Sequence, residues 1–303
     1  MGMPLKPTVI LTEDQIRSFH ADGFIQLPAL STPEEVAKLR DVFDRLFSQN
    51  AGRKEGFQYD LMGHDEDGKA PSLPQIINPV NYAPELKETQ FRANALAIAQ
   101  QLYGPECAPS FEHAILKPAG YGAPTPWHQD EAHRVDPNFE YRQVSIWMPL
   151  QEATEANGCM KFIPGSHLGP VLGHASPGND TKVHALECIG DFDQSAAILV
   201  PLQAGGATVH SGRTIHGAGP NRSAIPRRAY ILGFEVPPKL CEVQRDFPWL
   251  KEKQTANSER RKNWRRKGGV FVEAMRKLRR GFLTNPKRLV FEIKRAVRAI
   301  FRK

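Results

Sequence analysis

The 303-residue sequence has no apolar stretch of the roughly 18 or more residues that a membrane-spanning helix requires. Residues 1–6 lack the apolar region of a secretory signal, and Lys6 stands where a myristoylation motif requires Ser or Thr. We therefore expect neither a membrane-spanning protein nor a secreted one.

Cysteine is also scarce, because the chain has only four cysteines and no CxxC pair among them: Cys107, Cys159, Cys188 and Cys241. Their wide spacing argues against a disulfide framework and against a cysteine-based zinc site. We expect free thiols in a reducing compartment, and hence a cytoplasmic protein that can also sit peripherally on a membrane.

What the sequence does contain is a compact set of metal ligands. In an extended strand residues i and i+2 face the same way, so His128 and Asp130 can point at one metal ion while Gln129 faces elsewhere. His216 follows a predicted strand and turn and can supply a third ligand. Two imidazoles and one carboxylate leave one face of a ferrous ion open, as in non-haem iron oxygenases.

A candidate anion-binding residue follows eleven positions later. Arg227 opens the apolar run 229–234, which predicts a strand. A planar, permanently charged guanidinium suits bidentate binding of a carboxylate. Arg228 is the alternative, because neighbouring strand residues face opposite sides, but the spacing favours Arg227.

A His-x-Asp pair is common by itself, and its context carries the stronger signal. The chain closely resembles the phytanoyl-CoA dioxygenase family over roughly residues 9–238. The resemblance rests on residues 11–15, 22–24, 27–30, 126–130, 144–150, 157–167 and 216–223.

This resemblance implies an Fe(II)- and 2-oxoglutarate-dependent dioxygenase that uses O2. The implied fold is mainly β with helical additions, a double-stranded β-helix of the jelly-roll, cupin-like type. By position, His128, Asp130 and His216 correspond to the iron ligands, and Arg227 to the partner of the distal carboxylate of 2-oxoglutarate. Halogenating relatives have a small residue in place of the carboxylate ligand, so Asp130 favours hydroxylation; desaturation and ring formation stay open.

One position departs from the family pattern. Many members have a hydroxyl residue two places after the distal histidine, where this chain has Ala218. We expect that hydrogen bond to 2-oxoglutarate to be missing, or to come from Ser145 or Ser211. Trp147 is out of phase with its apolar neighbours, so it faces the cofactor or packs in the core.

The remaining histidines have structural and functional interpretations. His113 reads as a packed or rim residue, and His167 as structural after a turn. His133 lacks the partners of a zinc site. His210 either lies beside the iron ligands or packs elsewhere.

Three helices are predicted before the strands, over residues 13–21, about 33–48 and 85–103, and strands dominate residues 111–236. Residues 51–84 read as a long loop. This loop and residues 168–194 are expected to contact the substrate, which the sequence does not identify.

Residues 1–250, the predicted oxygenase domain, carry a net charge of −8, whereas the tail of residues 251–303 carries +15. The spacing of its apolar residues, at 270–282 and 289–300, predicts two basic amphipathic helices separated by residues 284–286. Such helices suit an anionic membrane surface, docking on the acidic domain, or nucleic acid; the apolar stripes favour the membrane over nucleic acid.

Three functions follow from these features. The leading one is a dioxygenase that hydroxylates a small organic or lipid-like substrate and converts 2-oxoglutarate to succinate. A non-catalytic metal-binding β-barrel whose basic tail targets a membrane or partner is the second. A metal-dependent hydrolase is the third, but no general base is evident beside the triad. Substrate-stimulated succinate formation separates them.

Overall fold

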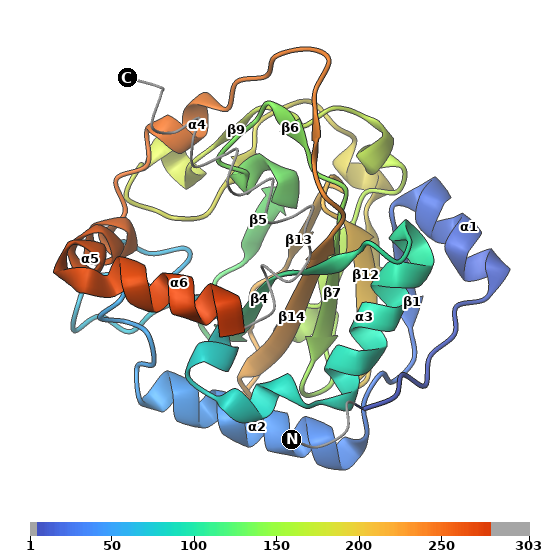
Figure 1. Cartoon of the computed structure of the whole chain (residues 1–303), viewed down its shortest axis with the longest axis horizontal. Coiled ribbons are helices and arrows are strands. Elements are labelled where there is room, and N and C mark those ends of the chain that lie inside the picture. Colours follow the sequence, from blue (N-terminus) through green and yellow to red (C-terminus); the bar gives the residue numbers. More distant parts are fainter. Residues whose placement is uncertain (1–4, 280–303) are drawn as a thin grey trace.

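The computed structural model describes residues 5–279 and consists of antiparallel sheets with flanking helices (Figure 1). The larger sheet has seven strands in the order β1 Phe24–Leu27, β12 Ala207–Ser211, β7 Gln143–Pro149, β14 Arg227–Glu235, β4 Ala108–Lys117, β3 Pro74–Ile77 and β2 Gln58–Asp60. The smaller sheet has four, in the order β11 Ile198–Val200, β8 Met160–Phe162, β13 His216–Ala218 and β5 Thr125–His128. Two short pairs flank them, β9 His174–Ala175 with β10 Glu187–Cys188 and β6 Phe139–Glu140 with β15 Lys239–Leu240.

The two predicted N-terminal helices are confirmed. In α1, Glu13–Asp22, the Thr12 and Gln15 side chains form a capping box, and Gly23 ends the helix in the left-handed conformation. Thr32 caps α2, Pro33–Ser48. The third predicted helix starts later than expected, because Thr89 caps α3, Gln90–Tyr103, after a separate 3-10 turn.

Alternation along the central strands separates two cores. Tyr230 on β14 and Ile146 on β7 belong to a core that the larger sheet shares with the helices α1 to α3. Ala229 and Trp147, one residue away on the same strands, belong instead to a core with Met160 and other residues of the smaller sheet. The two sheets therefore pack face to face, and alternate residues of β7 and β14 point between them.

The prediction of a long loop at residues 51–84 was wrong. The strands β2 and β3 extend the larger sheet beyond β4. The Asp60 carboxylate accepts hydrogen bonds from the backbone N–H groups of Ser72 and Leu73, at 2.9 and 2.8 Å, and so closes the connection between these two strands. Strands of three and four residues among Gly, Pro and Asp carry too little periodicity to be recognised.

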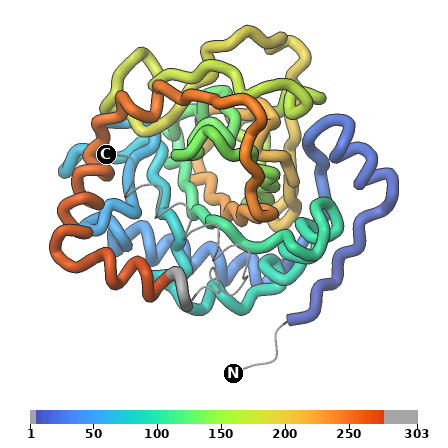
Figure 2. Tube along the Cα trace, turned by 45° about the horizontal axis from the view of Figure 1, so that its top comes forward, coloured from blue at the N-terminus to red at the C-terminus, as the bar shows by residue number. Residues whose placement is uncertain are grey.

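The C-terminal segment adds α4 Pro248–Lys251, α5 Ala256–Trp264 and α6 Val270–Arg279. In Figure 2 this segment, coloured orange to red, crosses the upper part of the molecule and then runs down along its left side. Lys253 Nζ donates to the carbonyls of Val183 and Ala185, at 2.7 and 2.6 Å, in one of the loops expected to contact substrate. The domain boundary at residue 250 stays a prediction, and the second amphipathic stripe, residues 289–300, lies outside the described residues.

As expected, none of the four cysteines, all of which lie within the described residues, forms a disulfide. Within residues 5–279, no helix combines the length and apolar character needed to cross a bilayer.

A buried polar network ties the sheet to α3 and gives a test of the packing. Tyr230 Oη donates to Glu112 Oε2 at 2.6 Å and accepts from Arg92 at 2.7 Å. Tyr230→Phe leaves both partners short of a hydrogen bond, so the free energy of unfolding should fall by about 1–3 kcal/mol in urea titrations. The exposed Tyr121→Phe is the control, and an equal loss there would contradict the assignment.

Candidate metal centre

Three side chains, two from neighbouring strands and one from the 3-10 turn that follows β5, converge on one point. His128, the last residue of β5, lies directly opposite His216, the first residue of β13, in the antiparallel register. Asp130 Oδ1 lies 3.7 Å from Nε2 of His128 and 3.7 Å from Nε2 of His216. One ligand atom from each of the three lies within 4.8 Å of the others, a spacing at which a single ion can touch all three.

Both imidazoles are oriented by their second ring nitrogen. His128 Nδ1 lies 2.9 Å from the Pro126 carbonyl oxygen, and His216 Nδ1 lies 2.8 Å from that of Thr214. A carbonyl accepts only, so each Nδ1 carries the proton and each Nε2 offers a lone pair toward Asp130. Burial lowers the pKa of both imidazoles, which keeps them in the neutral form that a metal binds.

Gln129 lies between His128 and Asp130 and holds this segment in place from the side that faces away from the candidate ligands. Its backbone is extended, so its side chain points away from the histidines. Its Nε2 donates to the carbonyls of Arg213 and Pro170, at 2.8 and 3.2 Å, and its Oε1 accepts from the Leu172 N–H at 2.8 Å. The segment that carries Asp130 is thereby bonded to the turn that precedes His216.

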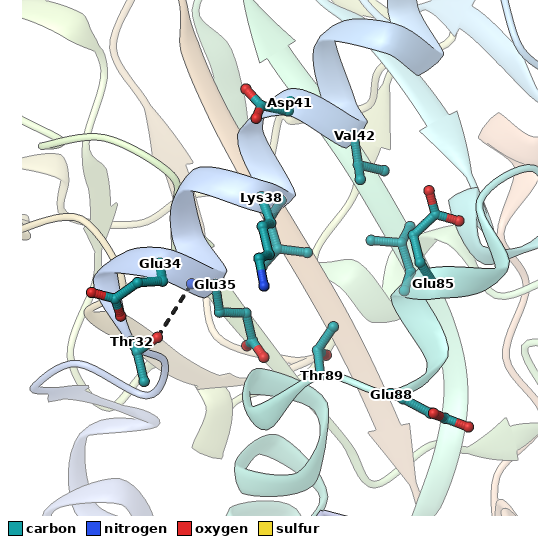
Figure 3. A pocket seen from close by; sticks show the side chains of 11 residues that line it. Thr32, Glu34, Glu35, Lys38, Asp41, Val42, Glu85, Glu88 and Thr89 are labelled. Carbon is teal, nitrogen blue, oxygen red and sulfur yellow. Dashed lines mark hydrogen bonds between the residues drawn. The ribbon is translucent and has the colours of Figure 1, made fainter. Parts of the chain in front are cut away.

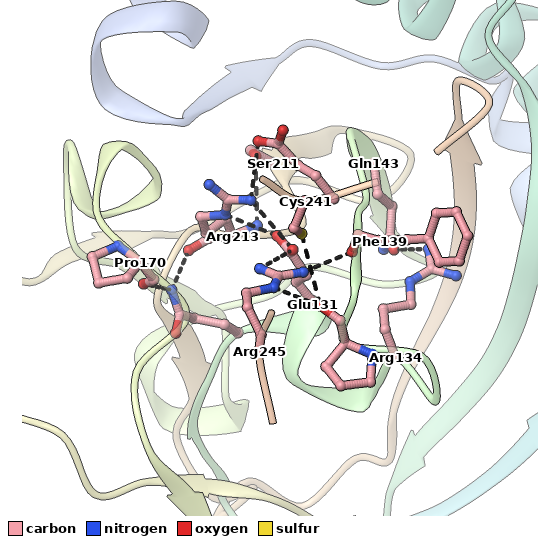
Figure 4. Close-up of polar contacts among 12 residues, drawn as sticks. Glu131, Arg134, Phe139, Gln143, Pro170, Ser211, Arg213, Cys241 and Arg245 are labelled. Atoms are coloured by element: carbon pink, nitrogen blue, oxygen red, sulfur yellow. Dashed lines mark hydrogen bonds and ion pairs between the residues drawn. The ribbon is translucent and has the colours of Figure 1, made fainter. Parts of the chain in front are cut away.

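The buried Glu131 strengthens the same connection (Figure 4). Its carboxylate binds Arg213 Nε at 2.8 Å and Arg245 Nη1 at 2.9 Å, while its N–H donates to the Gly212 carbonyl at 2.8 Å. Two guanidinium groups compensate the buried charge. Sequence reasoning missed this network, because Arg245 lies more than a hundred residues away in a segment without a recognisable motif.

Asp130 is held as a carboxylate by its neighbours. Ser145 Oγ donates to its Oδ2 at 2.6 Å, and His210 Nε2 lies 3.5 Å from the same oxygen. Burial would raise the pKa of Asp130, but the interactions with His210, His216 and His128 outweigh it and hold the pKa well below its ordinary value. Ser145 thus has a different partner from the predicted cofactor, and His210 lies beside the candidate ligands.

The two arginines on β14 point in opposite directions, as the strand period requires. Arg228 faces α2, where its Nη2 pairs with Asp44 Oδ2 at 2.9 Å. Arg227 is fully buried between the sheets, its guanidinium 5.3 Å from the centre of the Trp147 ring. Its Nε and Nη1 have no hydrogen-bond partner among the described residues. Burial lowers the pKa of Arg227 to about 9.

A second buried cation lies beside Arg227. Lys117 on β4 is the register partner of Arg227 and is fully buried, with its Nζ donating to the Ala123 carbonyl. Burial and the neighbouring Arg227 lower its pKa well below the ordinary value. These two basic side chains lie side by side, and two buried donors of Arg227 have no partner among the described residues, so an anion placed here would compensate them. Lys117 cannot be identified from the sequence alone, because the pairing of β4 with β14 is non-local.

The other residues predicted to contact the cofactor lie around the candidate site. Trp147 is buried between the sheets next to Arg227. Ala218 is buried in the same core and offers no hydroxyl. Ser211 lies at the end of β12, where the Arg213 N–H approaches its hydroxyl at 3.5 Å.

Two further histidines named from the sequence, His167 and His133, lie in different surroundings. His167 Nε2 lies 3.1 Å from the His20 carbonyl oxygen, consistent with a structural role. His133 lies between His128 and His184, with ring centres 6.1 and 6.4 Å away, and Tyr59 Oη bonds to His184 Nε2 at 3.0 Å. A polar row therefore extends from His128 to Tyr59 on β2.

The chain is similar in sequence to several dioxygenases. It is 27% identical over 228 residues to a probable alpha-ketoglutarate-dependent hypophosphite dioxygenase of Stutzerimonas stutzeri, covering 73% of this chain and 77% of that protein. It is 25% identical over 281 residues to phytanoyl-CoA dioxygenase 1 of Oryza sativa subsp. japonica, covering 82% and 97%.

Solved structures extend the likeness to the fold. The crystal structure of EvdO2 from Micromonospora carbonacea var. aurantiaca complexed with 2-oxoglutarate is 39% identical, with a TM-score of 0.68, and the match covers 81% of this chain and 99% of that one. The carbocyclase SnoK from nogalamycin biosynthesis, at 20% identity and a TM-score of 0.60, shares the fold. The sequence model of the phytanoyl-CoA dioxygenase family matches residues 19–229, which include every candidate ligand described above. The chain therefore belongs to the phytanoyl-CoA dioxygenase family, a family of non-haem iron dioxygenases.

Proposed function

We propose that this dioxygenase binds Fe(II) through His128, Asp130 and His216, binds 2-oxoglutarate through Arg227, and hydroxylates a small organic or lipid-like substrate. The observation that carries the proposal is the convergence of one carboxylate and two correctly oriented imidazoles, with two uncompensated buried cations in the same inter-sheet core. The double-stranded β-helix expected from the family fits the two facing sheets.

The donor set suits ferrous iron. Neutral imidazole and carboxylate are the ligands of non-haem Fe(II) oxygenases, and three protein donors leave positions for exogenous ligands. Iron with 2-oxoglutarate and O2 supplies the oxidising power that hydroxylates a C–H bond, while 2-oxoglutarate is decarboxylated to succinate.

The chain's own residues set the geometry for this chemistry. Ser145 and His210 hold the second oxygen of Asp130, so that the first stays turned toward the two imidazoles. Arg227 and Lys117 supply positive charge for the distal carboxylate of 2-oxoglutarate, which lets both cations stay charged while buried. Trp147 packs beside Arg227 and restricts where the guanidinium can lie.

Asp130 bears on the reaction type. Halogenating relatives have a small residue in place of this carboxylate, so Asp130 would disfavour halogenation; it does not separate hydroxylation, the proposed outcome, from desaturation or ring formation. A non-catalytic metal-binding module is the weaker alternative, because it gives no reason to bury Arg227 and Lys117 without an acidic partner.

Removing any one of the three ligands tests the metal site. His128→Ala, Asp130→Ala and His216→Ala should each abolish stoichiometric Fe(II) binding and succinate formation, because only three protein donors hold the ion. Metal content after anaerobic loading and gel filtration gives the measurement. His167→Ala, a histidine outside the cluster, should load normally. Full metal content in any of the three variants would contradict the assignment.

The neighbouring arginines provide a matched pair for the 2-oxoglutarate site. Arg227→Ala removes a charge-assisted contact and should weaken 2-oxoglutarate binding roughly ten- to a hundredfold. Arg228→Ala removes the pair with Asp44 and a hydrogen bond to the Pro226 carbonyl, both on the side facing α2, and should leave the affinity nearly unchanged. Calorimetric titration of both variants measures the difference, and a larger effect at Arg228 would overturn the proposed site.

A substitution of Lys117 distinguishes a role in binding 2-oxoglutarate from a role in stability. Lys117→Met keeps the volume of the side chain and removes the repulsion with Arg227, so the unfolding midpoint without ligand should not fall. The affinity for 2-oxoglutarate should fall about tenfold, the usual effect of one charged hydrogen bond. The exposed Lys87→Met is the control. Unchanged affinity in Lys117→Met would assign the lysine a packing role instead.

A further inference from the structure

Helix α6 packs on the protein with its polar side and turns its apolar side to solvent. Val270, Phe271 and Met275 are 60%, 73% and 37% exposed. Positions 270, 271, 274 and 275 lie on one face of a helix, and Ala274 is exposed as well. A surface helix of a globular protein normally shows the reverse arrangement, so this apolar face points to an interaction surface.

The inward side of α6 is held by ion pairs. Arg265 Nε binds Glu273 Oε2 at 2.8 Å, and Arg276 Nη1 binds Glu55 Oε2 at 2.5 Å. The Arg276 guanidinium also lies 5.1 Å from the centre of the Tyr82 ring. The contacts of Arg276 with Glu55 and Tyr82 attach this side of the helix to the rest of the protein, so the exposure of Phe271 follows from the packing of the opposite face.

Charge around this face is positive. Glu273 and Glu55, the acids on the inward side, are paired with arginines. Arg266 and Lys267 precede the helix and are exposed. Residues 280–303, which continue from α6 in sequence, carry eight Lys and Arg against one Glu. An apolar face flanked by basic residues matches the interface of an anionic bilayer, which offers hydrocarbon and negative headgroups together.

We propose that α6 is a membrane-contacting element, whose face of Val270, Phe271, Ala274 and Met275 inserts into the interface of an anionic lipid surface. The basic residues around it bind the lipid headgroups. This surface lies outside the oxygenase site, so it would place the enzyme near substrates that partition into membranes without taking part in catalysis.

Two docking arrangements within the protein itself fit the basic tail less well than a membrane does. The groove between α2 and the start of α3 is acidic, with Glu34, Asp41, Glu85 and Glu88 on its walls and a volume of about 550 Å³ (Figure 3). Its apolar residues Leu39 and Leu86 are already buried, so it offers little surface to an apolar stripe. Packing residues 289–300 against α6 would bring together two segments that both carry net positive charge, which is unfavourable.

Co-sedimentation of the full-length protein with vesicles tests the proposal. The protein should bind vesicles of phosphatidylcholine with phosphatidylglycerol, bind phosphatidylcholine alone weakly, and bind less as salt is raised. Val270→Ser with Phe271→Ser should weaken binding about ten- to a hundredfold, the effect of losing the burial of large apolar side chains. Arg266→Glu with Lys267→Glu should weaken binding to anionic vesicles only.

The matched control is Ile10→Ser, which removes a side chain that is 87% exposed before α1 and should leave vesicle binding unchanged. All variants should keep the wild-type unfolding midpoint, because the substituted side chains are exposed.

The proposal would be overturned if the full-length protein did not bind anionic vesicles, or if the α6 substitutions left the binding unchanged. A vesicle-free dimer that Phe271→Ser dissociates would overturn it in favour of a second copy of the chain. A chain ending at Arg279 that binds vesicles when the full-length protein does not would overturn it in favour of the chain's own tail.

Discussion

The antiparallel register between β5 and β13 is the constraint on which the site depends. It places His128 directly opposite His216, and a shift of one residue would turn one imidazole away from the other. Hydrogen bonds from both Nδ1 atoms to backbone carbonyls two residues earlier in the chain then fix the rings. Gln129 and Glu131, on either side of the turn, tie the segment carrying Asp130 to the turn before His216. The three candidate metal ligands are thus oriented by backbone and buried polar groups.

The second constraint is electrostatic. Arg227 and Lys117 are fully buried on neighbouring strands, and burial lowers the pKa of both. Charged groups are rarely buried without a partner, since desolvation costs several kcal/mol per ion, on the order of a weak ligand's whole binding energy. A dicarboxylate that reaches these cations and the metal would offset that cost. Binding of the cofactor and stability of the inter-sheet core are then linked.

The sequence predicts the parts of this site that follow local periodicity. His128 and Asp130 are two residues apart in extended chain, and Arg227 and Arg228 separate into inward and outward residues by strand parity. It does not predict Lys117, Glu131 or Arg245, because their partners lie on distant segments. Ser145 was expected as one possible substitute for the hydroxyl that Ala218 lacks, and in the structure its hydroxyl donates to Asp130, a contact that local periodicity does not predict. The stripe of α6 was also predicted, but its outward direction depends on the tertiary pairs of Glu273 and Arg276.

The central claim is that the triad and the two buried cations bind opposite ends of one 2-oxoglutarate molecule. Anaerobic calorimetric titration of 2-oxoglutarate, with and without Fe(II), into wild type, Asp130→Ala, Arg227→Ala and the double variant tests it most directly. The account predicts one 2-oxoglutarate per chain, tighter binding when Fe(II) is present, loss of that enhancement in Asp130→Ala, and persistence of the enhancement at weaker affinity in Arg227→Ala. Fe(II)-dependent enhancement that survives Asp130→Ala, or binding that is equally tight without the metal in wild type, would contradict it.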